Sequence, residues 1–537
     1  MKKSLTGLIA ILTFAQCART TQPNGGPKDI APPQLITSNP VNGQKNFKGK
    51  HIELEFNEYI KLKDPKEEIL ITPTAGPETK FNVRKNKLTI IPQYDWRDST
   101  TYSIAFRDGI QDQNEGNAAD NLHLAFSTGN IIDSLQIFGT VDEAFTEKIP
   151  DKITIAAFQL DTFDIFRHKP TYFTKANKKG KFSIQNLKPG QYYLYAFDDK
   201  NKNFKVDSKS EKFGFNITPV ILPASIDSVK LSIFHCDSRN TKVTSVRNAK
   251  AISTIRLNKL VSSAKLTADR PLLYSFGDNN GELIVQKDFE IADSILVKIH
   301  TLDSIQNSLD TAVYIKTTDS KVIDEKLKLS DWKIEFNLEN NQLKAESHSN
   351  KIIKTVTFDS IYIQIDTTTI QQIAPTDYAF DTLTKKITII KKLNVSKDEA
   401  QRPNPVLIFG KAAFVSINND STKAQQKDIK IPKSTEVGFF SVEIKTDKPH
   451  FTISLLSATN STIQSFSDQK KYTFKNIPSG EYKLLIHADD NNDRIWNPGN
   501  FLKYIQPEKV FFYKFLGKKY TEPIRANWEV GPFLITF

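Results

Sequence analysis

The stretch GKFSIQNLKPGQYYLYAFDDKNKNFKVD, residues 180–207, decides the fold, because a second version of it follows at KYTFKNIPSGEYKLLIHADDNNDRIWN, residues 471–497. In both versions, polar and apolar residues alternate up to a Gly-containing turn, and an apolar run then ends in Asp and Asn. Alternation with a period of two is typical of a half-buried strand, and two such runs around a glycine turn indicate a β-hairpin. The chain is therefore expected to build one β-module twice.

The length and composition of the chain predict several β-domains. A chain of 537 residues is too long for one hydrophobic core, and its length suggests three to five domains. It contains 39% hydrophobic residues, 36 phenylalanines and only 21 glycines, which is enough apolar material for sizeable cores. β-branched and aromatic residues are plentiful and favour strands. The predicted fold class is all-β, with tandem β-sandwich domains of Ig-like and prealbumin-like type.

The net charge of +12 is spread along the chain. Lysines alternate with acidic residues, as in KVIDEKLKLSD at residues 321–331, and no Arg-rich cluster or nucleic-acid motif occurs. A solvated, Lys-rich surface accounts for this pattern better than a dedicated polyanion site does. We therefore predict no nucleic-acid partner.

The N-terminus, MKKSLTGLIAILTFAQC, has a basic start followed by an apolar run that is too short for a stable membrane anchor. A cysteine directly after such a run resembles a bacterial lipoprotein signal, which implies lipidation at Cys17 and a membrane partner through the lipid. Ordinary signal cleavage nearby is the competing interpretation. Residues 1–17 are thus a predicted signal peptide and residues 18–30 a flexible tether. No acidic residue directly follows Cys17, which favours the periplasmic face of the outer membrane over the cell surface.

Residues 31–130 carry five landmarks in order: PPQLITSNPVNG, IELEFNEYI, LTIIPQYDWRDSTTYSIAF, DQNEGN and FSTG. Alternating strands and a hairpin at Lys85–Asn86 predict a small antiparallel sandwich. The order of landmarks resembles the bacterial Ig-like domain of the surface-layer-protein type. That resemblance implies an immunoglobulin-like sandwich with a spacer or adhesion role, and no enzyme.

The two versions of the hairpin lie in the second and last predicted modules. Residues 134–235 look like a prealbumin-type or carboxypeptidase-regulatory-like β-sandwich, and residues 406–537 repeat its plan. Residues 240–395 are strand-like throughout and predict one or two further Ig-like sandwiches. The polar, Pro-containing segment 394–405 is expected to be a linker. The chain closes with YTEPIRANWEVGPFLITF, a predicted final strand run with Trp528 buried.

The Asp- and Asn-rich loops are the candidate metal sites. Alternate oxygen-bearing side chains on a tight loop suit calcium, although position 6 is Phe204 or Arg494 rather than Gly, and no Glu stands at position 12. The alternative is that these side chains cap turns through bonds to the backbone. Glu211 and Glu508 lie downstream, and spacing alone does not show whether they take part. The candidate ligands at loop positions 1, 3, 5 and 9 are Asp199, Asn201, Asn203 and Asp207 in the first loop and Asp489, Asn491, Asp493 and Asn497 in the second.

Aromatic residues beside the second loop are candidates for contact with a glycan or a partner: Trp496, Phe501 and Tyr504. The alternative is that they pin the loop to the sandwich beneath it. The eight histidines form no metal-binding group, and no nucleophile elbow or phosphate-binding loop occurs. We therefore predict no catalytic residues and no cofactor beyond possible calcium. Cys236 has no expected partner and is predicted to be a half-buried strand thiol.

Together these features predict a non-enzymatic, lipid-anchored envelope protein that acts as a scaffold, a spacer or an adhesion module. Its partner would be an envelope protein or a glycan that the sequence does not identify. A glycan- or peptidoglycan-binding lipoprotein is the first alternative, and an enzyme accessory protein is the second.

Overall fold

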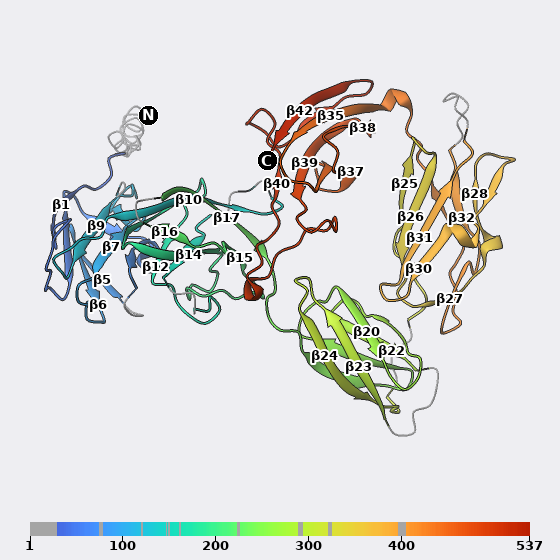
Figure 1. The fold of residues 1–537 in the computed structure, drawn as a ribbon, viewed down its shortest axis with the longest axis horizontal. Helices are drawn as coiled ribbons and strands as arrows, with labels where there is room; N and C mark the ends of the chain where they lie inside the picture. The colour runs from blue at the N-terminus through green and yellow to red at the C-terminus, as the bar shows by residue number, and fades with distance from the viewer. Residues whose placement is uncertain are drawn as a thin grey trace, which may run out of the picture. The chain divides into compact units, whose positions relative to one another are not determined.

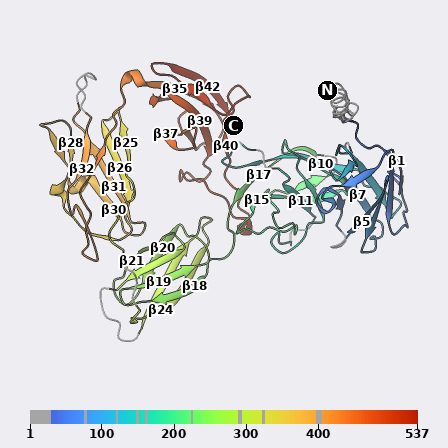
Figure 2. The ribbon, with the colours of Figure 1, turned by 180° about the vertical axis from the view of Figure 1, so that it is seen from behind.

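The computed structural model describes residues 29–74, 79–119, 122–146, 148, 151–159, 163–222, 226–287, 294–320, 325–395 and 404–537. The predicted signal peptide with Cys17, and the tether up to residue 28, lie outside these ranges. Every folded part is built from β-strands (Figure 1), and the reverse view gives the same picture (Figure 2). The chain divides into two compact units, Met1–Gln136 with two short later segments, and the remainder. We describe each unit by itself.

The first unit is a sandwich of antiparallel strands. One sheet has the order β1-β2-β6-β5, a second has the order β4-β7-β9, and β3 pairs with β8. The predicted hairpin is present: Arg84 pairs with Lys87, and Lys85 takes the left-handed conformation with a φ of 55°. The elements are β1 (Leu35–Asn39), β2 (Ile52–Phe56), β3 (Ile60–Leu62), α2 (Pro65–Glu68), β4 (Leu70–Thr72), β5 (Thr79–Arg84), β6 (Lys87–Pro92), β7 (Thr101–Ala105), β8 (Ile110–Asp112) and β9 (His123–Ser127).

The core of the first unit follows from the alternation in its strands. Ile52, Leu54 and Phe56 of β2 are fully buried, and Leu88 and Ile90 of β6 meet them from the neighbouring strand. Burial of one apolar face of each strand is the main contribution to the stability of such a sandwich.

The second module of the chain lies mostly in the second unit. β10 and β17 run parallel, while β14 is antiparallel to β11, β15 and β16. The full sheet order is β12-β11-β14-β15-β17-β10-β13, with β16 paired to β14. The strands are β10 (Leu135–Glu143), β11 (Thr154–Phe158), β12 (Tyr172–Lys175), β13 (Lys181–Leu187), β14 (Gly190–Phe197), β15 (Lys212–Phe215), β16 (Val220–Leu222) and β17 (Ile226–His235).

The last module has the same plan. β35 and β42 run parallel, and β39 is antiparallel to β36, β40 and β41. Each strand therefore has a counterpart in the second module, β14 with β39 and β17 with β42 among them. The elements are β35 (Val437–Lys445), β36 (Phe451–Ser457), β37 (Thr462–Ser467), β38 (Lys471–Pro478), β39 (Gly480–Ala488), the 3-10 helix η5 (Phe501–Lys503), β40 (Val510–Phe512), β41 (Glu522–Ile524) and β42 (Glu529–Thr536).

The two modules differ at one glycine position, beside a strand pair that only the second module forms. In the second module β15 pairs with β17, and a Cβ on Gly214 would lie 2.0 Å from the Ser232 carbonyl oxygen. The register places Phe511 at the counterpart position of the last module, where β40 and β42 belong to separate sheets. Phe511 instead packs near Phe537, with ring centroids 6.1 Å apart. The absence of a side chain at Gly214 thus permits the close approach of β15 and β17 in the second module.

Two further sandwiches lie between these modules. The third module has the sheets β18-β19-β22-β21 and β20-β23-β24, and the fourth has β25-β26-β31-β30, β29-β28-β32-β34 and β27-β33. The strands are β18 (Val243–Asn248), β19 (Ile252–Leu257), β20 (Ser263–Thr267), β21 (Leu273–Phe276), β22 (Glu282–Gln286), β23 (Ile295–Leu302), β24 (Ser308–Ile315), β25 (Lys333–Asn337), β26 (Gln342–His348), β27 (Ile353–Val356), β28 (Ile361–Gln364), β29 (Ile370–Gln372), β30 (Tyr378–Asp381), β31 (Lys386–Lys392), β32 (Val406–Phe409), β33 (Phe414–Ser416) and β34 (Gln425–Asp428).

The strand pairs differ from two expectations. The last module was expected to begin at residue 406, but β32 pairs with β28, so residues 406–428 complete the fourth module. The pairing of β28 with β32 joins strands on either side of the polar segment 394–405. These strands are too far apart in sequence for a local pattern to indicate that they pair. Trp528 was expected to be buried, but 58% of its surface is exposed. The turn that carries it ends just before β42 begins and leaves its ring outside the core.

Candidate functional site

The first Asp/Asn loop follows β14 and is held by its own side chains. Asp199 accepts hydrogen bonds from the N–H groups of Asn203 (3.0 Å) and Phe204 (3.1 Å). Asn201 Oδ1 accepts the same Asn203 N–H at 3.1 Å, and Asn203 Oδ1 accepts the N–H of Lys205 at 2.7 Å. Three of the four predicted positions of this loop are therefore brought together.

The second loop follows β39 and repeats these bonds one for one. Asp489 accepts the N–H groups of Asp493 (3.2 Å) and Arg494 (2.9 Å). Asn491 Oδ1 accepts from Asp493 N–H at 3.1 Å, and Asp493 Oδ1 accepts from Ile495 N–H at 2.7 Å. The two sequences thus fold into one loop conformation.

The backbone of both loops is left-handed at the same two positions. Lys202 and Phe204 have φ of 60°, and their counterparts Asn492 and Arg494 have φ of 59° and 62°. A side chain in this region costs roughly 1–2 kcal/mol. Position 6 therefore has the conformation for which calcium loops use Gly, although neither loop has a Gly there.

Position 9 does not join the loop. Asp207 Oδ1 accepts the N–H of Lys209 at 3.1 Å, and Asn497 Oδ1 accepts that of Gly499 at 2.8 Å. Both side chains cap the turn that follows them. The structure therefore separates Asp207 and Asn497 from the other predicted ligands.

A buried glutamate closes the first loop from beneath. Glu211 is fully buried and accepts the N–H of Lys200 at 2.9 Å and that of Asp207 at 2.7 Å. Burial raises the pKa of this carboxyl, although the backbone N–H groups counteract the rise. Spacing could not identify this residue as part of the site, because its role depends on where β15 begins.

Glu508 has the same place in the second loop. It accepts the N–H of Asp490 at 2.9 Å and that of Asn497 at 2.7 Å. Its Oε2 also lies 2.9 Å from Nε2 of the buried His487. A carboxylate that receives three bonds in a buried position fixes both ends of the loop.

These loops have the geometry of capped turns. Their carboxylate and amide oxygens accept backbone N–H groups, and burial raises the pKa of Asp199. Within the described ranges, no group of three or more His, Cys, Asp or Glu side chains is arranged to hold a metal ion. Calcium at the loops stays a prediction.

The segment after the second loop reaches the second module through aromatic side chains. The Trp496 ring centroid lies 4.7 Å from that of Phe145 and 5.3 Å from that of Phe234, and its Nε1–H donates to the Glu508 carbonyl at 2.8 Å. Sequence reasoning offered Trp496 as a glycan contact or a pin. The structure places it in an intramolecular aromatic contact between modules.

Phe501 packs against the same hydrophobic cluster. Its ring lies 5.7 Å from Phe166, 5.7 Å from Tyr195 and 5.4 Å from Phe215. Tyr504 instead keeps 57% of its surface exposed. Of the three predicted contact residues, only Tyr504 therefore presents most of its side chain to solvent.

Asn500 joins the last module to the third. Its Nδ2 donates to the Ile305 carbonyl at 3.1 Å and to Asn307 Oδ1 at 2.9 Å. Nearby, Lys503 Nζ donates to the Gln306 carbonyl at 3.3 Å. Asn500 is almost fully buried, so its amide is committed to this contact.

Gln506 adds a contact with the second module. Its Nε2 donates to the Phe215 carbonyl at 2.9 Å, and its Oε1 accepts the N–H of Ile217 at 3.0 Å. We call the segment from Trp496 to Gln506, with these partners, the junction. It ties the second, third and last modules together.

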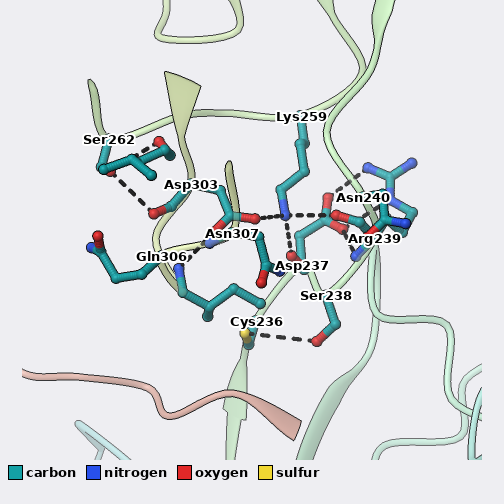
Figure 3. Close-up of polar contacts among 12 residues, drawn as sticks. Cys236, Asp237, Ser238, Arg239, Asn240, Lys259, Ser262, Asp303, Gln306 and Asn307 are labelled. Atoms are coloured by element: carbon teal, nitrogen blue, oxygen red, sulfur yellow. Dashed lines mark hydrogen bonds and ion pairs between the residues drawn. The ribbon is translucent and has the colours of Figure 1, made fainter. Parts of the chain in front are cut away.

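An ion pair includes Asp303, which belongs to the turn that Asn500 contacts (Figure 3). Lys259 Nζ is 2.7 Å from Asp303 Oδ2, and both side chains are buried. The same ammonium donates to the carbonyls of Asp237 and Arg239, which belong to the connection between the second and third modules. The pair therefore fixes the connection as well as the third module.

Asp303 also shapes the turn that Asn500 contacts. Its Oδ1 accepts the N–H groups of Ile305 and Asn307, each at 2.9 Å. Cys236 lies beside this region as a free, buried thiol, and burial raises its pKa to about 11. That pKa keeps the thiol protonated at neutral pH.

Two family models match parts of the chain. Residues 29–128 match a bacterial Ig-like domain, and residues 153–244 match an uncharacterized protein conserved in bacteria. The second match covers the first Asp/Asn loop. No curated protein matches the chain. The Ig-like resemblance of the first module is confirmed, and so is the predicted all-β fold of tandem sandwiches.

Several solved structures match this chain with little shared sequence and low TM-scores. The major pilin subunit BcpA of Bacillus cereus is 10% identical, with 76% of this chain and 99% of that chain covered and a TM-score of 0.13. The S-layer protein SbsC is 11% identical, with 73% and 66% covered and a TM-score of 0.13. Dimeric latent PorU from Porphyromonas gingivalis is 9% identical, with 54% and 36% covered and a TM-score of 0.22. At such scores these structures say nothing about what this chain does.

Proposed function

We propose that this chain is a non-enzymatic envelope protein that serves as a multidomain scaffold or spacer, held at the membrane by a lipid on Cys17. The junction is the observation that carries the proposal. Modules joined only by flexible linkers would not need such contacts. Here, polar and aromatic groups of the last module bind the second and third modules. Such contacts hold sandwiches at fixed separations, which is what a scaffold requires.

Two further observations support this role. The first module matches a bacterial Ig-like domain, and this resemblance implies a spacer or adhesion role. In the described part of the chain, no helix is long and apolar enough to cross a bilayer. The lipid on Cys17 is the attachment that we propose. We place the protein on the periplasmic face of the outer membrane.

Cross-linking in cells tests the proposal. A photoreactive amino acid at the exposed Tyr314 of the third module should give a discrete product with an envelope component. The Cys17→Ser variant should leave the membrane fraction and lose this product, because the lipid would be missing. A Cys17→Ser variant that stays in the membrane fraction would overturn the anchoring, and the absence of any cross-linked product at this and other exposed sites would overturn the scaffold role.

A further inference from the structure

The last module presents a mostly exposed tryptophan. Trp528 exposes 58% of its surface, whereas Trp332 is buried and Trp96 and Trp496 are partly buried. Tryptophan is enriched where binding energy concentrates. Phe439, 36% exposed, lies next to it: the Phe439 N–H donates to the Trp528 carbonyl at 2.8 Å.

The backbone holds this tryptophan in place. The Trp528 N–H donates to the Arg525 carbonyl at 3.2 Å, and the Asn527 N–H donates to the Val437 carbonyl at 2.8 Å. The turn lies directly on Gly438, where a Cβ would come within 2.3 Å of the Arg525 carbonyl oxygen. An aromatic ring on a fixed turn loses little conformational entropy when a ligand binds.

Polar side chains of both kinds surround the ring. The Arg525 guanidinium lies 5.3 Å from the ring centroid of Trp528 and supplies hydrogen-bond donors. Asn527 is exposed and offers both a donor and an acceptor. Glu529 is exposed and supplies acceptors, one of which receives the Ser441 hydroxyl at 2.5 Å. Sugar hydroxyls both donate and accept, so this mixture of side chains suits them.

We propose that the turn Arg525–Glu529, together with Phe439, binds the pyranose rings of a neutral polysaccharide. One sugar ring stacks on the indole of Trp528, while Arg525, Asn527 and Glu529 bind hydroxyl groups. The charges of Arg525 and Glu529 balance, which favours a neutral glycan over an anionic one. The exposed side chains of Trp528 and Phe439 provide far less apolar surface than the roughly 1,600 Å² that a standard protein–protein interface buries. This inference goes beyond the scaffold role and does not depend on it.

Binding to immobilised hexasaccharides of glucose, mannose, galactose and N-acetylglucosamine tests the inference with the full chain. The wild-type chain should bind at least one of them, and Trp528→Ala should weaken that binding about tenfold or more. Leu534→Ala is the matched control, because Leu534 is 56% exposed on β42 and should leave binding unchanged. Trp528→Phe should retain part of the affinity, since a smaller ring still stacks.

Circular dichroism and unfolding midpoints of the variants separate loss of binding from loss of fold. Trp528 and Leu534 are both exposed, so neither substitution should change the midpoint appreciably. The inference is overturned if the wild-type chain binds none of the four hexasaccharides. It is equally overturned if Trp528→Ala binds as the wild type does.

Discussion

Lys259 is the residue on which the connection between the second and third modules depends. It is buried with Asp303 and also donates to two carbonyls of the connecting segment. A buried pair stabilises little against an apolar replacement of both partners, but removing one partner leaves an uncompensated charge. The two carbonyls would also lose their donor. The pair therefore makes the fold of this region sensitive to single substitutions.

Lys259→Met should lower the free energy of unfolding by about 3–5 kcal/mol, because Asp303 stays buried without its counter-charge. Urea unfolding of the full chain, followed by fluorescence, measures the change. Arg270→Met is the control: Arg270 pairs with Asp269 at 3.2 Å in solvent, so its loss should change stability far less than Lys259→Met does. Equal effects of the two substitutions would contradict the structural role of the buried pair.

Gly214 is the residue on which the pairing of β15 with β17 depends. Gly214→Ala should destabilise the second module by about 1–3 kcal/mol, because its Cβ would meet the Ser232 carbonyl oxygen. Gly517→Ala serves as the comparison, since its Cβ would meet nothing within 4 Å and only the left-handed backbone disfavours it. Thermal unfolding of both variants should show the larger loss at Gly214.

Single residues mark where sequence reasoning succeeds and where it ends. The loop oxygens of Asp199 and Asp489 accept equivalent backbone N–H groups, because local spacing determines which N–H groups they reach. Trp528 was predicted to be buried because hydrophobic residues usually are. Its exposure depends on the turn at Gly438, which brings together segments far apart in the chain.

At the scale of elements, each Asp/Asn loop depends on one buried glutamate. Glu211→Gln should lower the free energy of unfolding by about 1–3 kcal/mol, because an amide offers one acceptor oxygen where the carboxylate offers two. Glu508→Gln should have a similar or larger effect, since Glu508 also binds His487. Glu443→Gln, at a half-buried position of β35, is the control. Effects no larger than the control would contradict the role of these glutamates.

Calcium distinguishes the two interpretations of the loops. We expect millimolar calcium to leave the thermal unfolding midpoint of the full chain unchanged relative to chelator, because backbone N–H groups occupy the loop oxygens. A ligand that binds only the folded state must raise the midpoint. A rise that disappears in both Asp199→Ala and Asp489→Ala would establish metal sites and overturn the expectation.

Strand pairs also show why elements were easier to predict than their assignment to modules. The alternation within β2 and the hairpin at Lys85 are local and were predicted. The pairing of β32 with β28 joins segments on either side of a Pro-containing stretch, and no periodicity reports it. The Gly214 position likewise matters only through β17, which follows it after a loop.

At the scale of the whole molecule, the junction determines whether the second unit behaves as one body. The double substitution Asn500→Ala with Phe501→Ala should increase the radius of gyration in small-angle X-ray scattering, because contacts to the second and third modules are lost. The circular dichroism spectrum of the chain should stay unchanged, because each module keeps its own fold. Tyr504→Ala is the control, because Tyr504 is exposed. An unchanged scattering curve would contradict the structural role of the junction.

The junction also has a consequence for the order in which the protein is made. Ile217 and Gln506 bond across 289 positions, and Trp496 and Phe501 complete a cluster whose other members precede them by hundreds of residues. Synthesis delivers the N-terminal modules first. The surfaces of Phe166, Phe215 and Phe234 that the last module covers therefore stay exposed to water until that module emerges. Ribosome stalling or proteolysis within the last module would therefore leave an exposed aromatic surface on an otherwise folded chain. Quality-control proteins that bind exposed apolar surface could recognise such an incomplete chain.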